Sequence, residues 1–560
     1  MPCLVYVAFY FMEAIFLLEH TATFIHTAIR EDLGADLTRL HTRFPPEPGG
    51  FLHIGSAKAV FINFELAKQY GGKVNLRMDD TNPVKEDASF VRAIQDEIRW
   101  LGYEWDGLYL ASDYFGIMYD CAVELIEKGV AFVCDMSAEE IRASFGGLGE
   151  AGAESPYRGR GVAENLDLFA RMKAGEFPDG ARTLRAKIDM ASPNLNMRDP
   201  VIYRIAHKEH SNTGNAWCIY PMYDFAHPLE DAIEGITHSL CGTEFEDHRP
   251  IYEWYVNQLD RFERKPRQIE FAEISVTNTI MGKRFIRPLV AAGTVDGWDD
   301  PRLVTIAGMR RRGYPAAAVR AFLAAAGVSK AKNRVEFAML EHFVREHLKG
   351  EAKTVMAVLN PLKVVIENYP EGAVEWISLP YGEEMPARDV PFAREIFIER
   401  EDFMEVPEKK FFRLAPGKEV RLKGAYAITC TEVVKNAAGE ITEVRATYDP
   451  ATKSGQDTSG RKIKGVLHWV EAAHALPIEA RLYDTLVLDD ETAEAGVVEN
   501  PNSLHTVAAL AEPALAQATE ADRFQFMRQG YFCLDAKVGE VGGRRVFNRT
   551  VGLKSSYKPG

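Results

Sequence analysis

The sequence predicts an α/β domain interrupted by an insertion, then a helical connector, then an all-β region. Strand-like and helical stretches alternate between residues 38 and 115, which is typical of a parallel, Rossmann-like sheet. Residues 290–345 are helical in pattern, and beyond residue 350 short strands alternate with turns, which indicates β-barrels. A chain of 560 residues is long enough for several such domains.

The first α/β unit contains a buried strand at residues 74–78 that ends at Asp79. An apolar helical pattern follows at Phe90, Val91, Ile94, Ile98 and Leu101. Residues 116–215 break this rhythm with a Gly-rich, charged stretch, and we expect them to form the insertion. The sheet pattern returns at residues 217–225. Since parallel sheets carry their chemistry at the carboxyl ends of the strands, Asp79 is a candidate site residue.

The composition is that of a folded protein, with 46% apolar and 26% charged residues. The net charge of −15 argues against a general electrostatic grip on nucleic acid, so RNA binding would depend on local basic patches. One candidate patch runs from residue 310 to 334 and another from 409 to 423. Taken alone, either patch is better explained as solvated surface.

The seven cysteines are scattered, with no Cys-x-x-Cys and no spacing suited to zinc, so we expect no structural zinc and a reducing, cytoplasmic environment. The apolar run from Cys3 to Met12 is interrupted by Glu13 and lacks the flanks of a signal peptide. We interpret residues 1–23 as an atypical N-terminal extension, with Met12 as an alternative start. A weak membrane anchor is the less favoured alternative.

The most informative stretch is residues 43–58, where a turn rich in proline and glycine leads into an apolar helical pattern that begins at His53-Ile54-Gly55. A histidine and a glycine at a helix N-terminus place an imidazole donor and bare backbone beside a positive helix end. Such an arrangement suits a nucleotide phosphate.

This stretch resembles the His-Ile-Gly-His signature of class I aminoacyl-tRNA synthetases, in the form shared by glutaminyl and by archaeal and eukaryotic glutamyl enzymes. Residues 280–284, in a segment expected to be a mobile loop, resemble the second signature of that family, Lys-Met-Ser-Lys-Ser, in its divergent glutaminyl form. The resemblance covers about residues 24–554. It implies formation of an aminoacyl adenylate from ATP, a reaction catalysed mainly by positioning and electrostatic stabilisation.

The resemblance implies that His53, Ser56 and Lys283 are catalytic, with His53 donating to the α-phosphate and Lys283 stabilising the triphosphate. The implied ATP-binding residues are Glu47, Pro48, Gly49, His53, Ile54, Gly55, Ser56, Ala57, Lys58, Gly242, Met281, Gly282 and Lys283. Ser56 stands where the family usually has its second histidine, and Gly282 where it usually has serine. We expect retained but altered catalysis, with a weakened RNA-binding paralogue as the alternative.

Five residues form the implied glutamine pocket: Arg43, Asp79, Tyr223, His227 and Cys241. Asp79 can pair with the α-ammonium group of a substrate. The related glutamyl enzymes carry an arginine where this chain has Cys241. A neutral cysteine would leave a buried glutamate carboxylate uncompensated, at a cost of several kcal/mol, so a carboxamide is favoured.

The resemblance also implies five contacts to RNA. Asp247 would read a base of the acceptor stem and Met136 would help to open its end. Arg413, Gln525 and Arg528 fall on positions that read the anticodon, where planar groups with several donors recognise unpaired bases.

The predicted organisation is a first catalytic half at 24–115, an acceptor-stem-binding insertion at 116–215, a second catalytic half at 216–289, a helical connector at 290–349, and two anticodon-binding β-barrels at 350–560. The expected reaction joins glutamine to tRNA(Gln) with ATP and Mg²⁺. We expect a cytoplasmic monomer without membrane contact and without a protein-held metal. A glutamate-specific or non-discriminating enzyme is the alternative.

Overall fold

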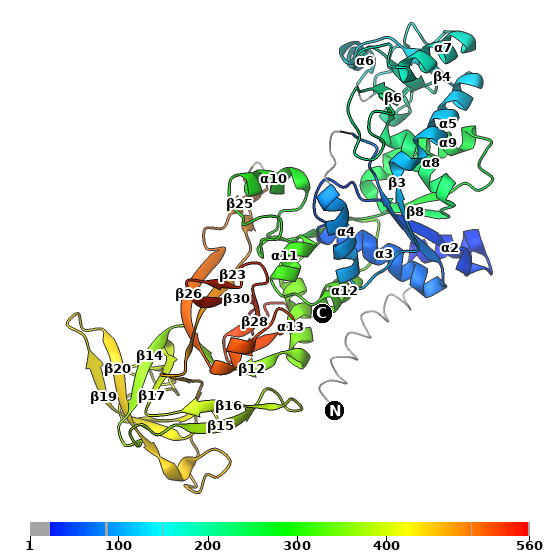
Figure 1. The fold of residues 1–560 in the computed structure, drawn as a ribbon. Coiled ribbons are helices and arrows are strands. Elements are labelled where there is room, and N and C mark those ends of the chain that lie inside the picture. The colour runs from blue at the N-terminus through cyan, green and yellow to red at the C-terminus, as the bar shows by residue number, and fades with distance from the viewer. Residues whose placement is uncertain (1–22, 84–87, 148, 494–495, 558–560) are drawn as a thin grey trace.

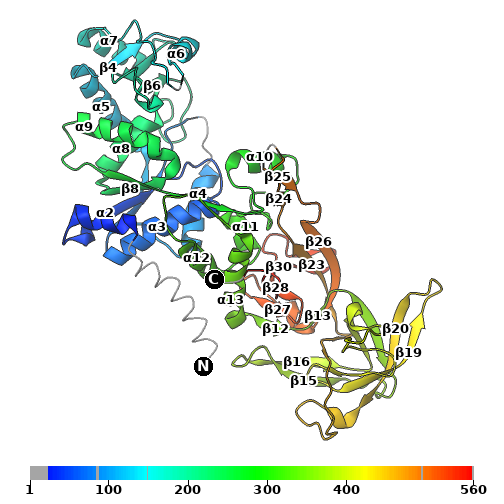
Figure 2. The same ribbon diagram turned by 180° about the vertical axis from the view of Figure 1, so that it is seen from behind.

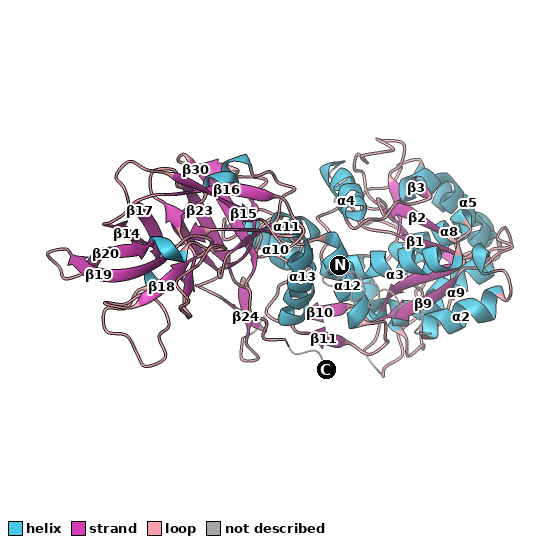
Figure 3. Ribbon diagram, turned by 90° about the horizontal axis from the view of Figure 1, so that it is seen from below, coloured by secondary structure: helices cyan, strands magenta, loops and turns pink. Residues whose placement is uncertain are grey.

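The computed structural model describes residues 23–83, 88–147, 149–493 and 496–557, so residues 1–22 of the expected N-terminal extension lie outside the described part. The molecule is elongated, with the insertion at one end, the barrels at the other, and the parallel sheet between them (Figure 1; Figure 2 shows the same arrangement from behind). Helices gather in the half that contains the parallel sheet and the connector, and the opposite half is built almost entirely of strands (Figure 3).

The parallel sheet is assembled from two segments of the chain. β1 (His41–Phe44), β2 (Lys73–Met78) and β3 (Gly107–Leu110) pair in parallel, as do β8 (His238–Gly242) and β9 (Arg267–Phe271). β8 continues beside β1, because the backbone N–H of Thr237 donates to the carbonyl of His41 at 2.9 Å. The carboxyl ends of β1, β2 and β8 therefore meet at one edge, as predicted for an α/β sheet.

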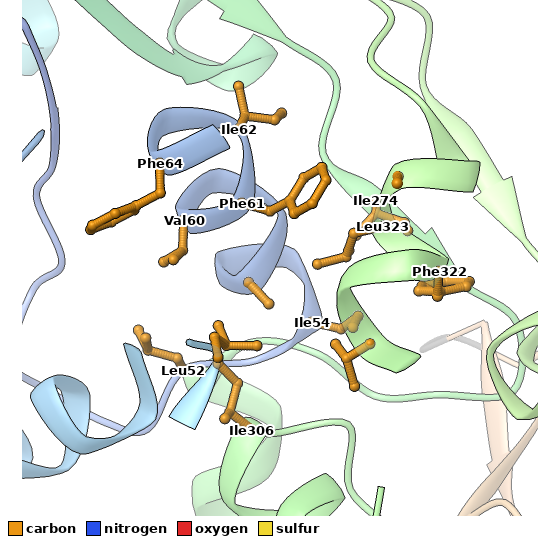
Figure 4. Close-up of a cluster of buried hydrophobic side chains, with 14 of the residues drawn as sticks. Leu52, Ile54, Val60, Phe61, Ile62, Phe64, Ile274, Ile306, Phe322 and Leu323 are labelled. Atoms are coloured by element: carbon orange, nitrogen blue, oxygen red, sulfur yellow. The ribbon is translucent and has the colours of Figure 1, made fainter. Parts of the chain in front are cut away.

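Helix α3 (Ile54–Tyr70) is the central helix of this domain and is apolar on several faces. It packs on α11 (Ile306–Arg311) and α12 (Ala316–Ala326) through the cluster that Figure 4 shows. The core also takes in α13 (Phe337–Glu351). The connector is thus part of the hydrophobic core of the catalytic domain. Because α3 is buried against the connector helices, the orientation of its N-terminus is fixed. α2 (Phe24–Leu33) and α4 (Ala88–Trp100) complete the helices around the sheet.

The insertion is a four-stranded antiparallel sheet, β4 (Ala131–Cys134), β5 (Thr183–Ala186), β6 (Val201–Ile205) and β7 (Ile219–Pro221), with helices α5 (Phe115–Glu127), α6 (Ala138–Ser144) and α7 (Val162–Lys173). The run at 217–225, predicted to resume the parallel sheet, instead supplies β7 and then enters α8 (Tyr223–Glu234). All three residues of β7 are buried, and so short a buried run does not show from the sequence which sheet it joins. Both α8 and α9 (Arg249–Gln258) pack on the core of the insertion.

The second barrel is a sheet in the order β12-β27-β28-β30-β23-β26-β13, and its two edge strands, β12 (Lys353–Val355) and β13 (Ala357–Val358), are consecutive in the chain. The first barrel, in the order β21-β18-β19-β20-β14-β17-β22, closes in the same way, because its edges β21 (Val466–Leu467) and β22 (Val470–Glu471) adjoin. Each sheet thus curls until its two edge strands adjoin, and the prediction of two barrels is confirmed.

The other strands of the β region have these bounds: β14 Pro361–Ile366, β15 Glu375–Pro380, β16 Ala387–Phe392, β17 Glu395–Glu399, β18 Glu419–Leu422, β19 Ala427–Lys435, β20 Ile441–Asp449, β23 Leu476–Tyr483, β24 Val487–Asp489, β25 Val497–Glu499, β26 Leu504–Ala511, β27 Phe524–Phe526, β28 Gly530–Leu534, β29 Glu540–Val541 and β30 Arg544–Val551. Two short parallel strands, β10 (Ile274–Val276) and β11 (Asn333–Val335), link the end of the catalytic domain to the connector.

The candidate basic patch at 310–334 is not a continuous surface patch. Arg311 is buried and forms two hydrogen bonds of 3.0 Å with Asp535, and buried Arg312 donates to the carbonyl of Thr550 at 3.2 Å. These arginines hold the connector against the second barrel. Both the RNA-binding interpretation and the solvated-surface interpretation are therefore wrong for them.

Candidate active site and RNA-binding residues

A cavity of about 520 Å³ lies at the carboxyl ends of β1, β2 and β8, beside the first turn of α3. Ligands of open α/β sheets bind at this edge. The cavity brings together residues that the sequence assigned to ATP and to the amino acid. The predicted residues that line it are Arg43, Glu47, His53, Gly55, Ser56, Asp79, Tyr223, His227, Cys241 and Gly242.

His53 is the N-cap residue of α3, and its Nδ1 accepts hydrogen bonds from the backbone N–H groups of Gly55 at 3.1 Å and Ser56 at 3.4 Å. Burial, and then the charge of Lys283, lowers the pKa of His53 to about 4. The ring is therefore neutral near pH 7. Because Nδ1 accepts, the proton resides on Nε2, which is left to act as a donor.

Gly55 is required by this cap. A Cβ at Gly55 would lie 2.9 Å from both Cε1 and Nδ1 of His53. Real Cβ atoms essentially never come so close, so any larger residue would displace the imidazole. The predicted role of Gly55 was to expose backbone to a phosphate; the structure adds that it makes room for the His53 ring.

Lys283 lies at the turn that precedes α3, although it is far from it in sequence. Its Nζ donates to the backbone carbonyl of Glu47 at 2.9 Å and lies 3.8 Å from Glu47 Oε2. The aliphatic part of the side chain packs on Gly50, where a Cβ would be 3.2 Å from its carbons. The cation that the sequence assigned to the triphosphate is therefore close enough to His53 to lower its pKa.

The second signature differs from the loop that was expected. Lys283 begins helix α10 (Lys283–Ala291), and Gly282 is its N-cap residue with φ of +93°. L-residues rarely adopt this left-handed conformation, whereas glycine does so without a Cβ penalty. The backbone therefore gives a physical reason for glycine at the position where the resembling family usually has serine.

Asp79, predicted to pair with the substrate ammonium group, and Tyr223, another residue of the predicted glutamine pocket, both line the cavity. The Asp79 carboxylate accepts a hydrogen bond of 2.8 Å from the Thr81 hydroxyl, and burial raises its pKa. The Tyr223 ring, at the start of α8, stacks on His227 with centroids 5.0 Å apart and an interplanar angle of 18°. A cation bound here would favour the ionised form of Asp79.

Arg43 lines the cavity, but the neighbouring side chains already engage its guanidinium. Nε donates to Asp231 at 2.8 Å, Nη1 to the Leu240 carbonyl at 2.9 Å, and Nη2 to Ser239 Oγ at 2.8 Å and to His227 Nε2. Burial, together with Arg43 and Arg77, lowers the pKa of His227 well below its usual value, so that ring is neutral.

A second fully buried arginine, Arg77, stands behind Arg43. It forms ion pairs with Glu230 at 2.9 Å, Asp231 at 2.7 Å and Glu234 at 3.0 Å. Arg43 and Arg77 hold the pKa of Asp231 well below its usual range, while burial raises that of Glu230. The positive charges of Arg43 and Arg77 are thus balanced by carboxylates of helix α8.

Cys241 lies at the carboxyl end of β8 and is only 9% exposed. Burial raises the pKa of its thiol to about 12, so the group is neutral near pH 7. The charges that act on it are one cation, Arg43, and the carboxylates of Glu270, Glu244 and Asp231. Because Asp231 already pairs with Arg43, that arginine brings no unpaired positive charge to Cys241.

Some predicted ATP-binding residues do not line the cavity. Ile54 and Ala57 are fully buried in the core around α3. Lys58 is buried and donates to the Ala272 carbonyl at 2.9 Å, with a pKa lowered to about 8 by burial. Their side chains lie on the faces of α3 that pack, since only one face of a helix can point to a cavity. The others outside the lining are Pro48, Gly49, Met281, Gly282 and Lys283.

The carboxylates that pair with Arg43 and Arg77 were not predicted from the sequence. They are Glu230, Asp231 and Glu234. A signal was present, because Arg77 lies in a strand that was predicted to be buried. A buried guanidinium requires carboxylate partners. On α8, Glu230 and Asp231 precede Glu234 by four and three residues, a spacing that lets each approach Glu234's side of the helix and supply such partners.

The predicted acceptor-stem residues lie on the side of the insertion. Met136 is half-buried directly after β4. Asp247 is exposed in a short 3₁₀-helix after β8, and its backbone carbonyl accepts hydrogen bonds from the side-chain amides of Asn194 at 2.7 Å and Asn196 at 3.1 Å. Two asparagines of the insertion thereby anchor the backbone at Asp247.

Two of the three predicted anticodon residues meet at the junction of the barrels. Arg413 and Arg528 come from different barrels and both bind Asp402, at 2.9 Å and at 2.5 and 2.8 Å. Gln525 lies on β27, three residues before Arg528. Asp402, at the centre of this group, was not among the predicted residues.

None of the helices in the described ranges combines the length and the apolar character that a bilayer-spanning helix requires. Within those same ranges, no three His, Cys, Asp or Glu side chains converge to hold a metal ion.

Three family models match the chain: the catalytic domain of class I tRNA synthetases (E and Q) at residues 39–350, and two anticodon-binding domains of the same group at 352–449 and 466–535. The glutamine–tRNA ligase of Clostridium perfringens is 55% identical over 548 residues, covering 96% of this chain and 99% of its own length. That of Clostridium kluyveri is 54% identical (96% and 98% covered), and that of Xanthomonas euvesicatoria 52% (95% and 97%). The chain belongs to the class I E and Q tRNA synthetases.

Proposed function

We propose that this protein is a glutamine–tRNA ligase, which activates glutamine with ATP and transfers it to tRNA(Gln) with release of AMP and pyrophosphate. The observation that carries this proposal is the single cavity in which His53, Asp79 and Cys241 meet, with Lys283 at its rim. Similarity to three glutamine–tRNA ligases over nearly the whole chain supports it. We propose a cytoplasmic monomer.

Activation requires an attack by the substrate carboxylate on the α-phosphate of ATP. We assign His53 Nε2–H as the donor to an α-phosphate oxygen, since Nδ1 is occupied by the helix cap. Lys283 stabilises the charge that grows on the leaving pyrophosphate. Fixed donors of this kind lower the barrier because they are already oriented when charge develops. Ser56, which lines the cavity, is assigned as a hydroxyl donor to the nucleotide.

Mg²⁺ enters this proposal with the nucleotide. Mg²⁺ is usually held by one or two carboxylates together with substrate phosphates, not by a cage made of protein alone. The cavity fits that mode, since the carboxylate of Glu47 lines it. The ion would neutralise charge on the phosphates.

We infer that glutamine is selected by the charged groups around Cys241. Asp79 binds the α-ammonium group, and Tyr223 and His227 form the side of the pocket. A glutamate side chain beside Cys241 would meet Glu244, Glu270 and Asp231, while Arg43 is already paired. An uncharged carboxamide has no such repulsion, which favours glutamine over glutamate.

The test is to charge purified tRNA(Gln) and tRNA(Glu) with glutamine and with glutamate. We expect glutamine on tRNA(Gln) alone. Equal or better charging with glutamate would favour the glutamate-specific or non-discriminating alternative. ATP–pyrophosphate exchange with tRNA present should fall about 10²- to 10³-fold in Lys283→Ala. Lys68→Ala, at an exposed position near the end of α3, is the matched control. No exchange by the unaltered protein would favour a weakened RNA-binding paralogue.

A further inference from the structure

Two arginines from different barrels converge on Asp402. Arg413 follows the short 3₁₀-helix that ends at Asp402, and Arg528 lies in the turn between β27 and β28. Arg413 Nη1 lies 2.9 Å from Asp402 Oδ1, and Arg528 donates through Nη1 and Nη2 to both carboxylate oxygens, at 2.8 and 2.5 Å. The carboxylate therefore fixes the position of one guanidinium relative to the other.

Asp402 is fully buried, and its backbone takes part in the same arrangement. Its carbonyl accepts a hydrogen bond of 3.0 Å from the N–H of Leu414, the residue after Arg413. A buried carboxylate is tolerated only when it is paired and hydrogen-bonded. Asp402 thus holds both the backbone and the side chain of the Arg413 segment.

Arg528 has φ of +68°, a left-handed conformation that residues other than glycine rarely adopt. Its bidentate bond to Asp402 holds it there, and the next residue, Gln529, donates from Nε2 to buried Glu399 at 2.7 Å. Strained backbone of this kind persists only where the surroundings over-determine it. The turn is held to the end of β17 through its strained residue and through the residue that follows it.

The charge at this junction is not balanced. Among the described residues, the ion pairs of Arg413 and Arg528 all go to Asp402, so two cations share one carboxylate. Both arginine side chains stay partly exposed, at 41% and 32%. By contrast, Arg388 and Glu512, another pair that links the two barrels, form a one-to-one pair that is 8% and 0% exposed.

We propose that Asp402 is a positioning residue for anticodon recognition: it holds Arg528 in its strained conformation and aligns Arg413 with it, so that one surplus positive charge and the outward donors face an unpaired base or phosphate. This inference rests on the proposed function. Without Asp402 the two guanidinium groups would repel each other and the turn would lose its main constraint. Asp402 itself, being buried, does not touch the RNA.

The test compares Asp402→Asn with Glu512→Gln, the matched loss of a buried carboxylate between the same barrels. Aminoacylation is measured with tRNA(Gln) and with transcripts that differ at single anticodon positions. For Asp402→Asn we expect the KM for tRNA(Gln) to rise about tenfold and the preference for the cognate anticodon to fall about tenfold, with the KM for ATP unchanged. For Glu512→Gln we expect that preference to stay within twofold.

Unchanged anticodon preference in Asp402→Asn, or an equal loss in Glu512→Gln, would overturn the inference. If Asp402→Asn does not fold, Asp402→Glu replaces it, because it keeps the charge but displaces it by one methylene; we expect an intermediate preference, and wild-type preference would count against us. Adding Asp402→Asn to Arg528→Gln should change preference less than twofold, whereas multiplying losses would contradict an action through Arg528. Failure of the unaltered protein to charge tRNA(Gln) would instead reject the proposed function.

Discussion

The amino-acid pocket and the barrel junction each hold two arginines on an aspartate, but they treat the charge in opposite ways. In the pocket, Arg43 and Arg77 are fully buried and face Asp231 together with two glutamates of α8. At the junction, Arg413 and Arg528 are partly exposed and share Asp402 alone. A site whose charges are balanced suits an uncharged side chain. A solvent-exposed site with excess positive charge suits a polyanion.

The same ion-pair motif therefore serves two purposes, which burial and partner number decide. The buried arginines of the pocket act as structure, since carboxylates of the protein pair with both of them. In the proposed function, the exposed pairs of the junction leave one cation for the RNA. Four predictions follow from this contrast, and each could contradict it.

The largest effect should come from removing the shared carboxylate of the pocket. Asp231→Ala leaves two buried guanidinium groups without their common partner, and we expect a loss of about 3–5 kcal/mol in the free energy of unfolding. Chemical denaturation measures it. Asp402→Ala, whose arginines can reach water, should lose clearly less. Equal losses would mean that burial does not distinguish the two regions.

Adding a cation to the balanced pocket should reverse its preference. In Cys241→Arg we expect the ratio of kcat/KM for glutamine to that for glutamate to fall about 100-fold, roughly 3 kcal/mol, because a carboxylate gains a partner and a carboxamide does not. Cys218→Arg, at a half-buried cysteine of the insertion outside the cavity, is the control and should keep the ratio. An unchanged ratio in Cys241→Arg would show that selection lies elsewhere.

The buried pocket should also respond to pH through His53. Its folded-state pKa of about 4 lies below the usual histidine value of 6.5, so the unfolded chain binds more protons between these values. Stability is therefore complete above pH 6.5 and falls as the pH drops toward 4, by at most about 1.4 kcal/mol per pH unit. Between pH 7 and pH 5, denaturation should show a loss up to about 2 kcal/mol larger in the wild type than in His53→Gln. Equal losses of stability in the wild type and His53→Gln would mean that burial does not lower the pKa of His53.

The smallest effect concerns salt. If Arg413 meets a phosphate, Arg413→Gln should lower the slope of log KM for tRNA(Gln) against log salt concentration by about 0.7–0.9, with a loss of affinity of roughly tenfold or less. Arg445→Gln, which removes a similarly exposed and paired arginine from the same barrel, is the control. A slope that both variants change alike would assign Arg413 to the general surface charge.

Much of this molecule could be predicted because the signals are local. Alternating strand and helix patterns gave the parallel sheet, and short strands with turns gave the barrels. The turn before His53 gave the helix end at the cavity. The run at 217–225 was assigned to the wrong sheet, since three buried residues look the same in either. Arg311 and Arg312 looked like surface charge because their partners, Asp535 and the Thr550 carbonyl, are more than 200 residues away.

By itself, the sequence determined the order of the domains, the helix that begins at His53, and the absence of a charged residue at Cys241. Only the tertiary structure decided which arginines are free to meet a ligand. That depends on how many carboxylates reach each guanidinium and on how much water does, and both are set by segments far apart in the chain. Asp231 and Asp402 are the same type of residue. Their surroundings alone place Asp231 in a group where the charges balance and Asp402 in one where two arginines share a single carboxylate.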